Sequence, residues 1–203
     1  MARLNVPTQD HISHESNPDQ LVSKENQASA EGLAQRDASN QSTPESVMNV
    51  SVIDRQPVKV AYLRHIGPYG EPLSRFWQEV AYPWIVSNNL LGQPRFGVSH
   101  DDPSITAPDK CRYDAAVEIT GPLAAPGRAT MTNIPGGRYG ITQFRGTASQ
   151  IGDVWIQILR EWLPSSGLQL DGRPFIEYYT SDSTFDPTTG VFTCELAVPV
   201  APL

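Results

Sequence analysis

Apolar and polar side chains alternate along two stretches of the chain, residues 58–66 and residues 138–145, and each stretch ends at a glycine. A period of two is typical of a β-strand with one buried face. Two further pairs of short β-rich runs occur in matching order, first at residues 94–100 and 174–179, then at residues 111–117 and 194–198. In the second pair each run begins at a cysteine, and the first pair aligns on Phe96 and Phe175.

Between the first and second strands of each set, the apolar residues recur at steps of three and four, which places them on one face of a helix. Pro83 is expected to kink or end the first helix, and Pro164 to stop the second. The two faces are made by Leu73, Phe76, Trp77, Val80, Trp84 and Leu91, and by Ile151, Val154, Trp155, Ile158, Leu159 and Trp162.

The order of elements is therefore strand, helix, strand, strand, and it occurs twice. Neither copy can bury its helix face alone, so the copies should pack together about a pseudo-twofold axis. We predict an α+β fold with antiparallel sheets, two main helices and a central cleft between the repeats. Repeat one covers about residues 47–120 and repeat two about residues 128–203, and a cleft between such halves is the natural place for a ligand.

The first part of the chain has a different composition. All 17 aromatic residues lie at or beyond Tyr62, and residues 1–57 carry four Lys or Arg against eight Asp or Glu. Such a segment buries too little apolar area to offset its ordering entropy. We predict that residues 1–46 are a disordered polar tail, that residues 47–53 form an edge strand, and that residues 47–203 form the folded domain.

Overall charge narrows the function classes. The formal net charge of −7 argues against direct nucleic acid binding, which needs clustered Lys and Arg. The sequence also has no apolar run long enough to span a membrane and no export signal, so a cytoplasmic protein is expected. Two cysteines make neither a disulfide framework nor a zinc site, and no cofactor or metal motif occurs.

Several motifs in the right order resemble the GyrI-like, or AraC-type effector-binding, domain family. They are VAYLRHIGPYG at 60–70, HDDP at 100–103, KCRYD at 110–114, IPGGRY at 134–139, WLP at 162–164 and FIEYY at 175–179. The resemblance runs from about residue 49 to residue 200. It implies a duplicated βαββ fold whose cleft takes small, often cationic and lipophilic molecules.

In that family, some members sense effectors for an attached DNA-binding helix-turn-helix, and others stand alone. Members of the second kind bind drugs, inhibit DNA gyrase, or hydrolyse strained cyclopropane-type compounds with a pocket glutamate. This chain lacks the apolar periodicity of a helix-turn-helix in its first 57 residues, which favours a stand-alone protein. The second copy also reads Gly146-Thr147-Ala148 where the first has Gly67-Pro68-Tyr69, so no aromatic ligand contact is expected in that second loop.

Glu177 is the strongest candidate for a functional side chain. Phe175, Glu177 and Tyr179 alternate onto one strand face, and a carboxylate on an inward face is costly unless it is paired. A cationic ligand would pair it, and in a dry site it could instead act as a general base on water. The structural alternative is a glutamate neutralised by an arginine, with Arg112 or Arg138 as the partner.

Other residues could complete a binding site. Tyr69 and Tyr179 are the best aromatic candidates, whereas Tyr113, Trp155 and Trp77 fit a core role at least as well. His100 is a possible residue of the cleft rim, although His100-Asp101-Asp102-Pro103 is more typical of a turn than of a metal site. The candidate ligand contacts are Glu177, Tyr179, Tyr69, Tyr113, Trp155 and His100.

The sequence thus predicts a stand-alone protein that captures cationic, hydrophobic compounds, as a sensor or as a sequestering protein. One alternative is a hydrolase of strained electrophiles that uses Glu177 as its general base. The other is a protein-interaction module like the gyrase-inhibiting relatives. A regulator or gyrase is accordingly a possible protein partner.

Overall fold

The computed structural model describes residues 48–203. The predicted disordered tail, residues 1–46, lies outside the described residues. The elements of the described part follow the predicted order, and each copy has its strand, its helical segment and two further strands. No helix within residues 48–203 is both long and apolar enough to cross a membrane.

The βαββ repeat is confirmed in both copies. Copy one consists of β2 (Val58–Ile66), α1 (Glu71–Phe76), a π-helical turn (Trp77–Ala81), α2 (Tyr82–Ser87), β3 (Arg95–Ser99) and β4 (Arg112–Glu118). Copy two consists of β6 (Gly137–Gly146), α3 (Ile151–Gln157), a π-helical turn (Ile158–Trp162), α4 (Leu163–Ser165), β8 (Phe175–Tyr179) and β9 (Phe192–Pro202). The remaining elements are β1 (Ser51–Arg55), β5 (Thr130–Ile134), β7 (Leu168–Leu170) and a 3₁₀ turn (Pro108–Lys110).

The strands form one curled antiparallel sheet in the order β1-β6-β9-β8-β3-β4-β2-β5, and β7 pairs separately with β9. β1 precedes copy one in the chain but pairs with β6 of copy two, while β5 precedes copy two but pairs with β2 of copy one. The two connections cross at Gly136, where a Cβ would lie 2.7 Å from the carbonyl oxygen of Arg55 and from the nitrogen of Pro57. The repeats therefore exchange the strands that precede them in the chain, β1 and β5.

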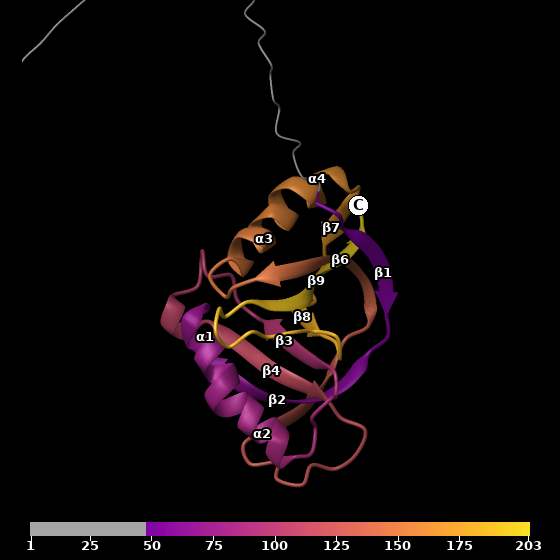
Figure 1. Cartoon of the computed structure of the whole chain (residues 1–203). Coiled ribbons are helices and arrows are strands. Elements are labelled where there is room, and N and C mark those ends of the chain that lie inside the picture. Colours follow the sequence, from indigo (N-terminus) through magenta and orange to yellow (C-terminus); the bar gives the residue numbers. More distant parts are fainter. Residues whose placement is uncertain (1–47) are drawn as a thin grey trace, which may run out of the picture. The chain divides into compact units, whose positions relative to one another are not determined.

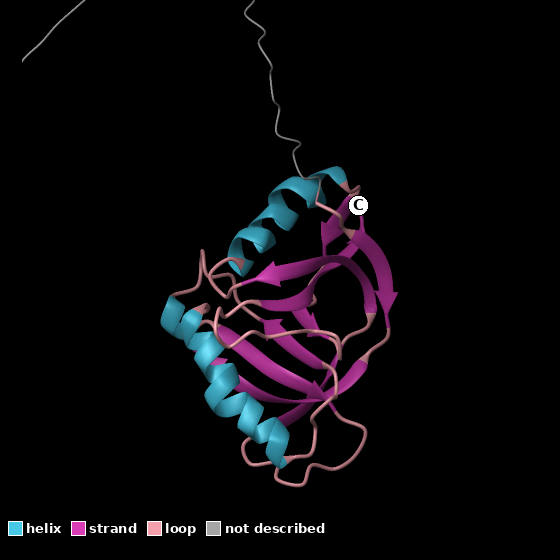
Figure 2. Ribbon diagram, in the orientation of Figure 1, coloured by secondary structure: helices cyan, strands magenta, loops and turns pink. Residues whose placement is uncertain are grey.

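Both helical segments pack against the same face of the sheet (Figures 1 and 2). Leu63 and Ala115 belong to the core under α1, and Leu196 belongs to the core under α3. A single row of register partners crosses five strands of this face: Leu63, Ala115, Gly97, Glu177 and Leu196. The third core, which includes Val60, Phe96, Val98 and Ile176, covers the other face. The row shows that Glu177 lies between the two helix cores.

Each helical segment contains a π-helical turn directly before its proline region. Pro83 and Pro164 both occupy the second residue of the α-helical turn that follows. A proline lacks the N–H that an α-helix needs and its ring crowds the preceding turn, so a widened turn before it accommodates both defects. Of the two outcomes expected at Pro83, a kink or an end, the end is not found, because the segment continues to Ser87. The second segment does end directly after Pro164.

The alignment of Phe96 with Phe175 is wrong by one residue. Phe96 pairs with Tyr178 and packs in the third core, whereas Phe175 packs on the helix face. Both are aromatic residues near the start of a short strand, so the local sequence does not show which residue of one strand corresponds to which residue of the other. The structural counterpart of Glu177 is instead Gly97, its direct partner in the β3–β8 pair.

Candidate functional site

Glu177 is buried at the centre of the sheet, with only 7% of its surface exposed. Its Oε2 accepts hydrogen bonds from the hydroxyls of Tyr113, at 2.6 Å, and of Tyr179, at 2.8 Å. Oε1 receives no hydrogen bond from residues 48–203. Tyr113 comes from β4 and Tyr179 from β8, so strands of both repeats hold the carboxylate in place.

Gly97 provides the space for this arrangement. A Cβ at this position would lie 1.8 Å from the Tyr113 hydroxyl oxygen and 2.6 Å from Oε2 of Glu177. Because β3 lies between β4 and β8, any side chain on Gly97 would separate the tyrosine from the glutamate. A glycine at this position therefore allows Tyr113 to reach across β3.

Trp77, the first residue of the π-helical turn in copy one, completes the cluster. Its Nε1 donates to the Tyr113 hydroxyl at 3.1 Å. Its ring meets those of Tyr113 and Tyr179 edge-on, with centroids 6.4 and 5.7 Å away. The sequence pattern assigned Trp77 to the core because it lies on the apolar helix face, and that face is indeed the one that covers Glu177.

Glu177 has no ion-pair partner among the described residues. The two arginines proposed as partners are engaged elsewhere: Arg112 with Asp101 at 2.9 Å, and Arg138 with Asp54 at 4.0 Å. Burial raises the pKa of Glu177, and the hydrogen bonds from the two tyrosines act against this rise. The structural alternative of a glutamate neutralised by an arginine is therefore wrong within this part of the chain.

The tyrosines of the cluster remain hydrogen-bond donors over the physiological pH range. Burial, and then the nearby charge of Glu177, raise the pKa values of Tyr113 and Tyr179 well above that of a free tyrosine. Trp77, Tyr113 and Tyr179 thus surround the carboxylate with neutral, aromatic groups, and none of them supplies a compensating charge.

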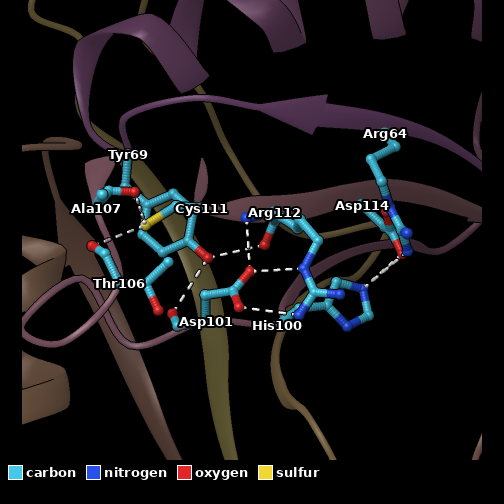
Figure 3. A network of polar contacts seen from close by, with 9 residues as sticks. All are labelled: Arg64, Tyr69, His100, Asp101, Thr106, Ala107, Cys111, Arg112 and Asp114. Carbon is cyan, nitrogen blue, oxygen red and sulfur yellow. Dashed lines mark hydrogen bonds and ion pairs between the residues drawn. The ribbon is translucent and has the colours of Figure 1, made fainter. Parts of the chain in front are cut away.

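Tyr69 lies next to this cluster. Its ring meets that of Tyr113 edge-on at 6.2 Å between centroids. Its hydroxyl donates to the backbone carbonyls of Arg112, at 2.8 Å, and Asp101, at 3.2 Å (Figure 3). Burial raises its pKa to about 12. The ion pair between Asp101 and Arg112 joins the two residues whose carbonyls accept from Tyr69, and so it positions Tyr69 against Tyr113.

Trp155 and His100 lie outside the Glu177 cluster. Trp155 stacks on Phe175 at 5.4 Å in the core under α3. His100 Nε2 lies 2.6 Å from the carboxylate of Asp114, which also forms two hydrogen bonds with Arg64 (Figure 3). Asp114 directly follows Tyr113 in β4, so its side chain lies on the other face of the sheet.

His100, Asp114 and Arg64 line a separate pocket of about 140 Å³ on that other face. Burial by itself raises the pKa of Asp114, but the hydrogen bonds with Arg64 and His100 outweigh it and hold the pKa below its usual value.

The turn interpretation of the HDDP motif is confirmed, because Oδ1 of Asp102 accepts from the backbone N–H of Ser104 at 2.8 Å.

The two cysteines are buried, as predicted, and neither forms a disulfide, but they do not start equivalent strands: Cys111 directly precedes β4 and Cys194 is the third residue of β9. Burial raises the pKa of both thiols. Within residues 48–203, no group of three or more His, Cys, Asp or Glu side chains is placed to hold a metal ion.

Comparison with known proteins identifies a family. The sequence profile of the GyrI-like small molecule binding domain matches residues 48–201, which is nearly the whole described part of the chain.

Two relatives illustrate the range of names within this family. YosT of Bacillus subtilis (strain 168), named as a prophage-derived transcriptional regulator, is 28% identical over 154 residues, 75% of this chain and 99% of YosT. A protein of Edwardsiella ictaluri (strain 93-146) named DNA gyrase inhibitor is 29% identical over 158 residues, 75% of this chain and 98% of the relative.

Among solved structures, SAV2435 bound to tetraphenylphosphonium has the same fold. The match has a TM-score of 0.53 at 16% sequence identity, and it covers 76% of this chain and 94% of SAV2435. The α+β fold with two helices on one face of a curled antiparallel sheet is therefore shared with a protein whose structure contains a lipophilic cation.

Proposed function

Since this chain belongs to the GyrI-like small-molecule-binding domain family, we propose that it captures cationic, hydrophobic compounds between its two repeats, with Glu177 as the counter-charge. It would act in the cytoplasm as a sensor or as a sequestering protein. The supporting observation is the environment of Glu177, a carboxylate that is buried and has no ion-pair partner within residues 48–203.

A buried carboxylate without a cation is energetically unfavourable in its charged form. A lipophilic cation supplies the missing charge without bringing its own tightly held water. Both tyrosine hydroxyls bind Oε2, which leaves Oε1 available to face such a ligand. Glu177 would thus recognise the charge of the ligand, and the aromatic rings around Glu177 would keep water away from the bound cation.

The aromatic rings favour the same class of ligand. Trp77 and Tyr179 lie within 5.7 Å of each other between centroids, and Tyr69 extends the aromatic surface beyond Tyr113. A cation over such rings gains roughly 0.5–2 kcal/mol per ring. Trp155 is a more distant candidate, because its ring is stacked on Phe175. The tetraphenylphosphonium in the structure of SAV2435 is a ligand of this chemical class.

Two roles are consistent with a ligand-binding domain of this kind. As a sensor, the protein would pass its response to a separate regulator, and we expect no direct nucleic acid binding from a chain with a net charge of −7. As a protein-interaction module it would instead bind gyrase, an alternative that rests on the relative named DNA gyrase inhibitor. A pull-down that recovers either partner would distinguish these roles.

The second candidate function is a hydrolase in which Glu177 is the general base. The raised pKa of Glu177 is the observation in its favour, since a carboxylate of that kind accepts a proton from water more readily. Tyr113 or Tyr179 would donate to the developing negative charge on the substrate. Product formed by the wild type and not by Glu177→Gln would establish this reaction.

The test is a titration of the full-length protein with tetraphenylphosphonium, followed by tryptophan fluorescence and with mass spectrometry of the probe. Glu177→Gln should weaken binding at least about tenfold, equivalent to about 1.4 kcal/mol. Glu118→Gln is the matched control, because Glu118 pairs with Val60 and so lies on the other face of the sheet. Equal binding by wild type and Glu177→Gln would refute the proposal. Consumption of the probe, or of a strained cyclopropane-type analogue, by wild type alone would favour the hydrolase.

A further inference from the structure

A pocket of about 240 Å³ lies next to the Glu177 cluster, on the helix face of the sheet. It is formed where the end of α2 and the loop after it approach the end of β8. Its apolar walls include Ile85 and the half-exposed Tyr82 and Leu91, and Thr180 and Ser181 come from copy two. The pocket is therefore bordered by both repeats.

Arg95 is the charged residue of this pocket. It is the first residue of β3, two positions before Gly97, so its side chain lies on the same face as Glu177. Within residues 48–203 its guanidinium forms no ion pair and no side-chain hydrogen bond. A guanidinium has five N–H donors and no acceptor, and its geometry matches a carboxylate held by two parallel hydrogen bonds.

Tyr179 connects the pocket to the buried glutamate. Arg95 is the register partner of Tyr179, and its guanidinium carbon lies 5.8 Å from the centre of the Tyr179 ring. The hydroxyl of that ring donates to Glu177. One aromatic side chain thus contacts the anionic group at its hydroxyl and the cationic group at its ring face.

This arrangement bears on the charge of the ligand. A ligand with a positive charge alone would be attracted by Glu177 but repelled by Arg95 wherever it extends into the pocket. A ligand with a second, negative group would satisfy both residues. The Tyr179 ring, which contacts both groups, and the apolar walls of the pocket beside Arg95 suit the hydrocarbon or aromatic part that joins the two charges.

We propose that the preferred ligands are zwitterionic, with a lipophilic cationic part at Glu177 and a carboxylate or similar anionic group held by Arg95. This inference rests on the proposed function, since it concerns the same ligand. It makes Arg95 a residue that determines specificity, and it distinguishes this protein from a general binder of lipophilic cations.

Two probes that differ in one group test the proposal: pentyltriphenylphosphonium and (4-carboxybutyl)triphenylphosphonium. Both have the same cationic head, and only the second has a carboxylate at the end of its chain. The wild type should bind the carboxylated probe at least about fivefold more tightly at pH 7.5. Arg95→Gln should abolish that preference by weakening the carboxylated probe and by leaving or improving the affinity for the pentyl probe.

Arg145→Gln is the control variant, because Arg145 is exposed, follows Phe144 in β6 and so lies on the other face of the sheet, and does not line the pocket. It should keep the preference of the wild type. If both probes bind wild type equally, or if Arg95→Gln changes both affinities by the same factor, Arg95 does not recognise the anionic group and the inference is wrong. If neither probe binds, the proposed function fails instead. A melting curve of each variant checks that the fold is retained.

Discussion

Gly97 lies directly opposite Glu177 in the β3–β8 pair, and its missing side chain is what allows the hydroxyl of Tyr113 to cross β3 and reach the carboxylate. The glycine, the glutamate and the tyrosine come from three adjacent strands and two repeats. The site therefore exists only in the assembled sheet, and it depends on the space that Gly97 leaves.

Gly97→Ala should destabilise the protein by about 1–3 kcal/mol, because the new methyl group overlaps with Tyr113 and Glu177 in a packed interior. It should also weaken binding of tetraphenylphosphonium. Urea unfolding and the fluorescence titration measure the two effects. Gly152→Ala is the matched control: no atom lies within 4 Å of its Cβ position in α3, so it should gain about 0.5–1 kcal/mol. Equal effects of the two changes would contradict the packing argument.

Tyr113→Phe should cost more stability than Tyr179→Phe, by about 1 kcal/mol. The first change removes a donor to Glu177 and also the acceptor of the Trp77 indole N–H, whereas the second removes one donor only. Urea unfolding of the two variants at pH 7 provides the comparison. Equal losses in the two variants would show that Trp77 finds another partner when the Tyr113 hydroxyl is absent, and a larger loss in Tyr179→Phe would contradict the prediction.

Stability should depend on pH through Glu177. Burial raises its pKa in the folded protein above the unfolded value, so the folded state binds the proton more tightly. The resulting stabilisation is complete at pH values below the pKa of Glu177 in the unfolded chain, and it is lost as the pH rises through the pKa of Glu177 in the folded protein. Glu177→Gln lacks this term.

Denaturation of the wild type and of Glu177→Gln between pH 4 and pH 8 measures that term. The wild type should lose stability relative to the variant as the pH increases, by about 1.4 kcal/mol for each unit by which the pKa is raised. A difference between the two proteins that does not change with pH would show that Glu177 has an ordinary pKa.

His100→Gln should leave the affinity for tetraphenylphosphonium unchanged within about twofold, because His100 pairs with Asp114 on the other face of the sheet. Stability should decrease by about 1–2 kcal/mol, since a hydrogen bond to a charged partner is weakened or lost. A tenfold loss of affinity without a loss of stability would restore His100 as a ligand contact.

The order of elements could be predicted from the sequence because it depends on local periodicity. The alternation at residues 58–66 and 138–145 and the helical pattern that follows each stretch can be read within one copy, without knowledge of the other. The edge strand predicted at residues 47–53 is also found, as β1 at Ser51–Arg55, where it pairs only with β6.

The composition of the site depends on long-range register, which local patterns do not contain. Alternation along β8 placed Phe175, Glu177 and Tyr179 on one face, and this is confirmed. The hydrogen bond from Tyr113 to Glu177 passes over Gly97, so it depends on the pairing of β3 with both β4 and β8. The assignment of His100 to the cleft rim failed for a related reason, because the sequence does not show on which face of the sheet His100 lies. A one-residue error, as in the alignment of Phe96 with Phe175, moves a side chain to the opposite face.

The exchanged strands determine how the protein can adapt to ligands of different sizes. β1 ties copy one to the outer side of copy two and β5 does the reverse, so the copies cannot rotate apart without breaking backbone hydrogen bonds at both ends of the sheet. Adjustment is then left to side-chain rotamers, chiefly those of Trp77 and Tyr179. Ligand binding should accordingly shift their side-chain NMR signals while amide hydrogen exchange in β3 and β8 stays slow, and selectivity becomes a question of which rotamers the rings can adopt.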